Sequence, residues 1–119
     1  MSKIMIVDDS PDLVDFLTLL LTMRKFEVET ATSKAQIEEK LALFVPDVIL
    51  LDVRLNGEDG REICRYIKAK TPFKHIPILL LSADPKLLDG YEECEAADII
   101  EKPFDIASLL EKVNNQILS

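Results

Sequence analysis

The sequence predicts an α/β sandwich in which five strands alternate with five helices around one parallel sheet. Short apolar runs recur along the chain without alternating polar residues, which is typical of parallel strands covered by helices on both faces. Stretches with apolar residues at helical spacing separate these runs. The 119 residues, 48% of them hydrophobic, suffice for one compact domain, so residues 1–119 are taken as one domain.

The predicted strands are rich in Ile, Val and Leu. Four of them are apolar throughout and cover residues 4–7, 48–51, 78–81 and 99–100. A fifth, residues 27–31, alternates polar and apolar residues, as an edge strand with one solvent-facing side does. Because this strand comes second in the chain, the pattern favours the flavodoxin-like strand order 2-1-3-4-5 in a three-layer (βα)5 sandwich.

The five predicted helices have recognisable beginnings. The second helix starts with a capping box and continues to about residue 43. The fourth is predicted as one continuous helix to residue 94, because apolar residues recur at helical spacing up to that position. The expected starting signals, in chain order, are Ser10 with Pro11, Ser33 with Gln36, Asp59, Pro85 and Asp105.

Charge and composition exclude several classes of partner. The chain has 14 basic and 22 acidic residues and a net charge of -8, so it repels nucleic-acid backbones and anionic membrane surfaces. No apolar stretch approaches the roughly 20 residues that span a bilayer, and no signal segment precedes Asp8. Cys64 and Cys94 form no metal-ligand motif and are expected to be buried thiols. These features together indicate a cytoplasmic protein.

Polar residues follow each buried strand where the strand ends. Asp8 and Asp9 follow the first strand, Asp52 the third, Ser82 the fourth and Lys102 the fifth. Taken singly, such residues could simply begin turns or cap helices. Ligands of open parallel sheets, however, bind beyond the carboxyl ends of the strands where the strand order reverses, here between the first and third strands. Three carboxylates gathered there repel one another unless a cation neutralises them, and oxygen ligands suit Mg²⁺.

The ordered set of these residues resembles the receiver domain of bacterial response regulators, over essentially the whole chain. Lys102-Pro103-Phe104 and Ser82-Ala83 match motifs of that family, as do the acidic pair at 8–9 and the segment from Asp52 to Gly60. The resemblance implies a signalling domain rather than a turnover enzyme, although such a domain assists its own phosphorylation and dephosphorylation. It also implies a Lys102-Pro103 bond that is often cis.

The resemblance further implies a role for each site residue. Asp52 would accept a phosphoryl group from phosphohistidine on a sensor histidine kinase or a histidine phosphotransfer protein. Asp9, Asp52 and the backbone carbonyl of Arg54 would bind Mg²⁺, with Mn²⁺ as a substitute, and Asp8 would act through a water molecule. Ser82 and Lys102 would contact the phosphoryl oxygens. Phosphorylation would then switch a surface for a downstream protein or output domain, and the helix 4–strand 5–helix 5 face is the expected surface for partners or dimers.

Several positions depart from the family pattern. Ile99 replaces a common aromatic residue, Asn56 a proline and Glu95 a glycine. Arg54 and Asp84 each lie two residues after a predicted site residue, and we hypothesise that they pair and limit water access to the phosphoryl group. Two independently solvated charges are the alternative interpretation.

Three other functions compete with phosphoryl acceptance. The chain could be a degenerate receiver that acts only as a phosphorylation-independent interaction module. A phosphatase of the haloacid dehalogenase type would need an Asp-x-Asp motif where Asp8 and Asp9 are adjacent. A flavin-binding electron carrier would need a glycine- and hydroxyl-rich phosphate loop after the first strand, where the two aspartates would repel phosphate.

Overall fold

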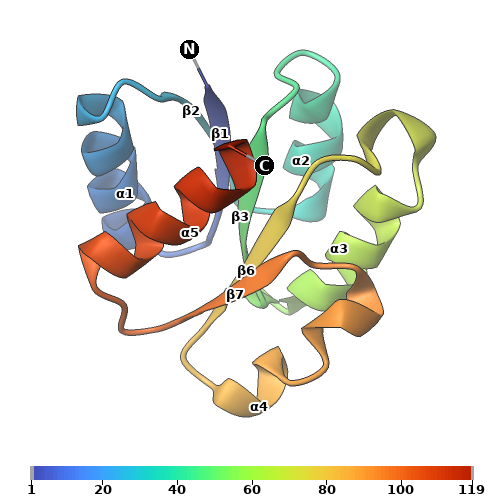
Figure 1. The fold of residues 1–119 in the computed structure, drawn as a ribbon. Coiled ribbons are helices and arrows are strands. Elements are labelled where there is room, and N and C mark those ends of the chain that lie inside the picture. Colours follow the sequence, from blue (N-terminus) through green and yellow to red (C-terminus); the bar gives the residue numbers. More distant parts are fainter. Residues whose placement is uncertain (1, 119) are drawn as a thin grey trace.

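A computed structural model describes residues 2–118 and has a five-stranded sheet at its centre (Figure 1). The strand order is β2-β1-β3-β6-β7 and every neighbouring pair is parallel, which confirms the predicted order of the five main strands. The strands are β1 (Lys3–Val7), β2 (Glu27–Ala31), β3 (Val48–Asp52), β6 (Ile78–Ser82) and β7 (Asp98–Glu101).

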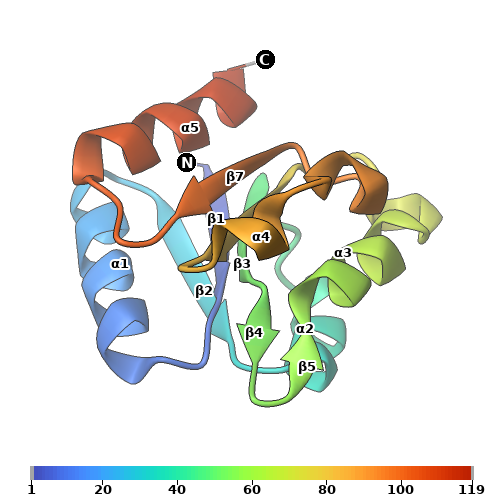
Figure 2. The ribbon, with the colours of Figure 1, turned by 90° about the horizontal axis from the view of Figure 1, so that it is seen from below.

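Helices cover both faces of this sheet. Helices α1 and α5 lie on one face, and α2, α3 and the short α4 lie on the other (Figures 1 and 2). Ser10, Ser33 and Asp59 cap their helices as predicted, each accepting a hydrogen bond from a backbone N–H in the first turn. The helices are α1 (Pro11–Met23), α2 (Lys34–Leu41), α3 (Gly60–Lys68), α4 (Pro85–Leu88) and α5 (Ile106–Leu118), with 3₁₀ helices η1 (Thr71–Phe73) and η2 (Tyr91–Cys94).

The core is divided into two layers by the sheet. Successive residues of a strand point to opposite faces, so each central strand supplies both layers and must be apolar throughout. The layer beneath α2, α3 and α4 receives Met5, Val7, Ile49, Leu51, Ile78 and Leu80, and the layer beneath α1 and α5 receives Ile4, Ile6, Val48, Leu50, Leu79 and Leu81. Cys64 and Cys94 are buried free thiols in the first layer, as expected.

The prediction of one continuous fourth helix is wrong. Helix α4 ends at Leu88, the backbone of Asp89 is extended, and Gly90 adopts a left-handed conformation with φ of 68° before η2 begins. An Asp-Gly pair favours a turn over a continued helix, because glycine adopts positive φ without steric cost. The apolar spacing persists across the break because Leu88 and Cys94 are buried in the same core layer.

A small β-hairpin that the sequence analysis did not predict follows β3. Strands β4 (Arg54–Leu55) and β5 (Glu58–Asp59) pair antiparallel across a two-residue loop. The loop residues Asn56 and Gly57 have φ of 45° and 87°. Positive φ at both positions is the mark of a type I′ turn, for which Asn-Gly is the favoured sequence. Proline, whose φ is fixed at about −65°, could not adopt the φ of 45° that Asn56 has in this turn.

Lysine side chains cover a carbonyl on each edge strand of the main sheet. The Lys40 ammonium donates to the carbonyl oxygen of Thr30 in β2 at 2.5 Å. At the opposite edge, the Lys112 ammonium donates to the carbonyl oxygen of Ile99 in β7, also at 2.5 Å. Both edges thus carry a positive charge hydrogen-bonded to their backbone.

Candidate functional site

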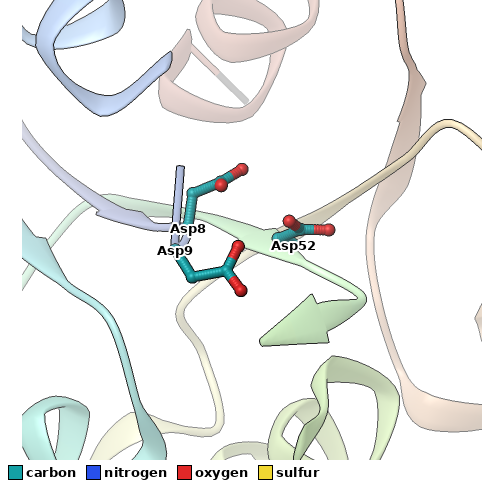
Figure 3. A group of neighbouring side chains, drawn as sticks. All are labelled: Asp8, Asp9 and Asp52. Atoms are coloured by element: carbon teal, nitrogen blue, oxygen red, sulfur yellow. The ribbon is translucent and has the colours of Figure 1, made fainter. Parts of the chain in front are cut away.

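The three strand-end aspartates converge at the carboxyl ends of β1 and β3 (Figure 3). Carboxylate oxygens of Asp8, Asp9 and Asp52 lie within 4.8 Å of one another. Asp8 and Asp52 are only 2% and 8% exposed, whereas Asp9 is half-buried. These aspartates, with Ser82 and Lys102, line one cleft of about 550 Å³. The fold therefore brings together all five residues that the sequence analysis placed at the strand ends.

Lys102 is the cation that this acidic group contacts. Its ammonium lies 2.9 Å from Asp8 Oδ2 and 3.3 Å from Asp52 Oδ2. Burial alone would lower the pKa of Lys102, but the hydrogen bond to Asp8 and the charges of both carboxylates outweigh it and raise that pKa. Lys102 is therefore held in its charged form between the two aspartates. Its peptide bond to Pro103 is cis, as the family resemblance suggested.

Opposing effects act on the pKa of Asp52, and the net result is a raised pKa. Burial raises the pKa of its carboxyl group and the neighbouring charge of Asp8 raises it further, while a hydrogen bond from the Arg54 backbone N–H and the charge of Lys102 act in the opposite direction. The Arg54 N–H lies 3.2 Å from Asp52 Oδ1, so that oxygen is oriented by the backbone that leads into the hairpin. The net result is a carboxylate whose negative charge is only partly compensated by the protein.

The Asn56-Gly57 hairpin fixes another member of the acidic group. The Asn56 backbone N–H donates to Asp9 Oδ2 at 3.0 Å. At the far side of the same hairpin, Glu58 Oε1 accepts a hydrogen bond of 3.1 Å from the backbone N–H of Lys34, the first residue of α2. The hairpin thus connects the acidic site to α2. The sequence analysis missed this role of residues 56–58, although the Asn-Gly dipeptide was a readable hairpin signal.

Gly60 allows α3 to begin directly against the strand that carries Asp52. A Cβ atom at this position would lie 2.1 Å from the Asp52 carbonyl oxygen and 2.8 Å from Val53 Cα, distances at which atoms overlap. The Gly60 N–H donates to the Val53 carbonyl at 2.6 Å. A larger residue would push α3 away from the end of β3, so this glycine is needed for the local shape of the site.

The rim of the cleft is formed by residues that follow β3 and β6. Ser82 is 4% exposed, and its Oγ accepts a hydrogen bond of 3.0 Å from the Asp84 N–H. Asp84 Oδ2 lies 3.5 Å from Arg54 Nη2, so the pairing suggested by the sequence does form. The two side chains are 37% and 74% exposed, which makes this a solvent-facing contact at the mouth of the cleft.

The donor set fits a divalent cation. Three carboxylates against the single ammonium of Lys102 leave a formal charge of about −2 in the cleft when all are ionised. The candidate ligands are oxygens, which suit Mg²⁺ and similar hard cations better than zinc or copper. Asp9 has Oδ2 held by a backbone N–H, which leaves its other carboxylate oxygen for a metal ion. Asp52 has Oδ1 held by the Arg54 N–H and Oδ2 contacted by Lys102 at 3.3 Å, so a metal ion would share Oδ2 with the lysine.

A (βα)5 domain with an acidic, lysine-containing cleft at this edge of its sheet is built like a signalling receiver. A family model described as the response regulator receiver domain matches residues 4–114. The chain therefore belongs to the response regulator receiver family, and the resemblance stated from the sequence is confirmed.

Two curated relatives are similar along almost the whole chain. The response regulator PleD of Caulobacter vibrioides is 35% identical over 120 residues, which cover 96% of this chain and 26% of PleD. The DNA-binding dual master transcriptional regulator RpaA of a Synechocystis strain is 30% identical, with 95% of this chain and 48% of RpaA covered. The chain thus spans about a quarter of one relative and about half of the other.

Solved structures have the same fold. A putative response regulator from Chloroflexus aurantiacus superposes with a TM-score of 0.92 at 29% identity, covering 99% of this chain and 98% of that one. The BeF3-activated N-terminal receiver domain of Klebsiella pneumoniae RstA superposes with a TM-score of 0.88 at 28% identity, covering 99% and 100% of the two chains. Within residues 2–118, no helix has the length and apolar character needed to cross a membrane.

Proposed function

We propose that this receiver domain accepts a phosphoryl group on Asp52 in a Mg²⁺-dependent reaction. Support comes above all from the position of Asp52, whose carboxylate lies in the cleft beside two further carboxylates and the Lys102 ammonium. The donor is a phosphohistidine of a sensor histidine kinase or a histidine phosphotransfer protein. Phosphorylation changes the surface offered to a downstream protein or output domain.

In the proposed reaction an Asp52 carboxylate oxygen attacks the phosphorus of phosphohistidine. The new O–P bond forms as the P–N bond breaks, and the histidine leaves with the electron pair of that bond. Phosphoryl transfer depends mainly on positioning and on neutralising charge. The Arg54 N–H, 3.2 Å from Asp52 Oδ1, positions the nucleophile. Lys102, 3.3 Å from Asp52 Oδ2, is close enough to transfer its contact to a phosphoryl oxygen.

The metal ion would be held by Asp9, Asp52 and the backbone carbonyl of Arg54, with Asp8 acting through a water molecule. When bound, Mg²⁺ neutralises charge shared between the acceptor and the phosphoryl oxygens, and Mn²⁺ would substitute for it. The Asn56 N–H keeps Asp9 turned toward this position through Oδ2. Ser82 accepts from the Asp84 N–H but keeps its own hydroxyl proton, which it donates to a phosphoryl oxygen in the proposed product.

The proposal includes the wider setting of the domain. The chain acts as a cytoplasmic switch, in keeping with its two buried free thiols, and is not a turnover enzyme. With a net charge of -8 it does not itself bind nucleic acid. The face formed by α4, β7 and α5 is the proposed surface for partners or a dimer, although α4 contributes only residues 85–88 to it.

Phosphodonor treatment followed by mass spectrometry tests the proposal. Acetyl phosphate with Mg²⁺ should add one phosphoryl group to the wild-type chain, and none when the metal is chelated. The Asp52→Asn variant should remain unlabelled, while the control Asp89→Asn, outside the cleft, should be labelled like the wild type. Retained labelling of Asp52→Asn would place the acceptor elsewhere. An unlabelled wild-type chain that still binds Mg²⁺ would favour the alternative of a phosphorylation-independent interaction module.

A further inference from the structure

A groove between α2 and α3 is separate from the cleft at Asp52. The two helices lie side by side on the same face of the sheet (Figures 1 and 2), and Phe73 of η1 forms part of the lining. The groove encloses about 240 Å³ and shares no lining residue with the acidic cleft. Four buried aliphatic residues form its floor, each at most 3% exposed: Ile37, Leu41, Ile63 and Ile67. The half-buried rings of Tyr66 and Phe73 stand beside this floor and supply the apolar surface that remains open to solvent.

Two ammonium groups stand beside one aromatic ring in this groove. Lys34 Nζ lies 3.8 Å from the centroid of the Tyr66 ring, and Lys70 Nζ lies 4.5 Å from the same centroid. The ring attracts each cation, but the two like charges repel each other. Positive charge is therefore concentrated next to an apolar floor.

Neither of these lysines forms an ion pair within the described part of the chain. Lys3, Lys40, Lys102 and Lys112 each have a carboxylate within 4.0 Å, whereas residues 2–118 contain no such partner for Lys34 or Lys70. Glu38 lines the groove but does not approach either ammonium to that distance. The two lysines that line the groove are therefore available to an anion from outside.

We propose that this groove binds a small amphiphilic anion, namely a monocarboxylate with an aromatic or branched aliphatic body. The body lies over this floor and against the half-buried rings of Tyr66 and Phe73, where it removes their remaining apolar surface from water. The carboxylate lies between the ammoniums of Lys34 and Lys70 and relieves their mutual repulsion. The volume of about 240 Å³ lies below the range of about 300–1,000 Å³ that is usual for ligand pockets, which limits the ligand to about 10–15 non-hydrogen atoms. For ligands of this size we expect a Kd of about 0.1–1 mM.

The charge of the remaining surface makes this assignment selective. The chain has a net charge of -8, so anions are repelled from most of its surface. An apolar neutral molecule would gain only from the floor, and a hydrophilic anion only from the lysines. A molecule that combines both features is the class that uses both parts of the groove.

Titration of the whole ¹⁵N-labelled chain with 2-naphthoate, followed by NMR, tests the proposal. Saturable shift changes should be confined to α2, α3 and η1. Lys34→Gln and Lys70→Gln should each weaken binding by about two- to fivefold, the effect expected of a partly exposed ion pair. Lys74→Gln, which removes an exposed lysine outside the groove, should leave Kd unchanged. The neutral analogue 2-naphthalenemethanol should bind more weakly and should not respond to the lysine substitutions.

A further variant tests the contribution of the groove's space while both lysines are kept. Ala42 is exposed and lines the groove, so Ala42→Trp should fill the groove and abolish binding while the other amide resonances keep their positions. Non-saturable shifts, shift changes centred outside α2, α3 and η1, or equal affinities of the wild type and both lysine variants would each overturn the proposal. Phosphorylation of Asp52 is not needed for any of these measurements, so their outcome is independent of the proposed function.

Discussion

Replacing Lys102 with methionine tests whether this lysine acts as the internal counter-ion of the acidic cleft. Methionine keeps much of the aliphatic stem and removes the ammonium, which lies 2.9 Å from Asp8 and 3.3 Å from Asp52. At an effective dielectric constant of about 20, these separations correspond to gross attractions of about 6 and 5 kcal/mol. The desolvation of the lysine opposes much of this attraction.

The expected net loss is much smaller than the gross attraction. Removing one partner of a buried ion pair destabilises proteins by about 3–5 kcal/mol. The Lys102 side chain is 22% exposed and the side chains of Asp8 and Asp52 are 2% and 11% exposed, so the lower end of that range applies. We therefore expect Lys102→Met to lower the free energy of unfolding by about 3 kcal/mol in the presence of a chelator.

Magnesium should restore more stability to this variant than it adds to the wild type. At a concentration 100-fold above its Kd, a ligand of the native state stabilises it by about 2.7 kcal/mol. Without Lys102 the cleft has one more uncompensated negative charge, so Mg²⁺ should bind more tightly. Each tenfold gain in affinity would add about 1.4 kcal/mol to the stabilisation at the same Mg²⁺ concentration.

Urea unfolding followed by circular dichroism, with chelator and with Mg²⁺, measures both quantities. Lys3→Met is the matched control, because the Lys3–Glu27 pair is 3.9 Å long and exposed. It should cost at most about 1 kcal/mol and leave the Mg²⁺ increment unchanged. If Lys102→Met and the wild type gained the same stability from Mg²⁺, the lysine would not be compensating the carboxylates and the reasoning would be refuted.

Three further predictions concern residues around the site and the loops. Arg54→Ala and Asp84→Asn should each accelerate loss of the phosphoryl group severalfold, as followed by mass spectrometry; asparagine keeps the side-chain oxygen that caps α4. An unchanged rate of loss would mean that Arg54 and Asp84 are two independently solvated charges. Glu95→Gly should raise the free energy of unfolding by about 1 kcal/mol, because Glu95 has a left-handed φ of 66°; a lower urea midpoint would contradict this. Hydrogen bonds from Arg61 lower the pKa of Asp59, so Asp59→Asn should cost less than about 1 kcal/mol at neutral pH, and urea titrations should show this difference disappearing as the pH falls below 3.8.

The sequence predicted the main sheet well because the two core layers leave an unambiguous pattern. A strand such as residues 48–51 faces helices on both sides, so each position must be apolar. The alternating strand at Glu27–Ala31 then had to lie at an edge, and this placed the ends of β1 and β3 next to each other. The convergence of Asp8, Asp9 and Asp52 follows from that topology and could therefore be foreseen.

Local backbone geometry was less predictable from apolar spacing. The break at Asp89-Gly90 interrupts a helix without interrupting its buried positions, so periodicity alone could not reveal it. The Asn56-Gly57 turn depends on the preference of this dipeptide for positive φ, a local property that apolar spacing does not reflect. The contact of the Asn56 N–H with Asp9 uses a backbone group and joins residues 47 positions apart, and no side-chain pattern encodes such a contact.

The lysines over the two edge strands have a consequence for how this domain can be joined to other proteins. An uncovered edge would invite a strand from another molecule to extend the sheet, which is a common route to aggregation. The ammoniums on Thr30 and Ile99 occupy backbone acceptors that such an incoming strand would need. Assemblies built from this domain should consequently form through side chains, including those of the α4, β7 and α5 face, and not by strand addition, so the sheet should remain five strands wide in any of them.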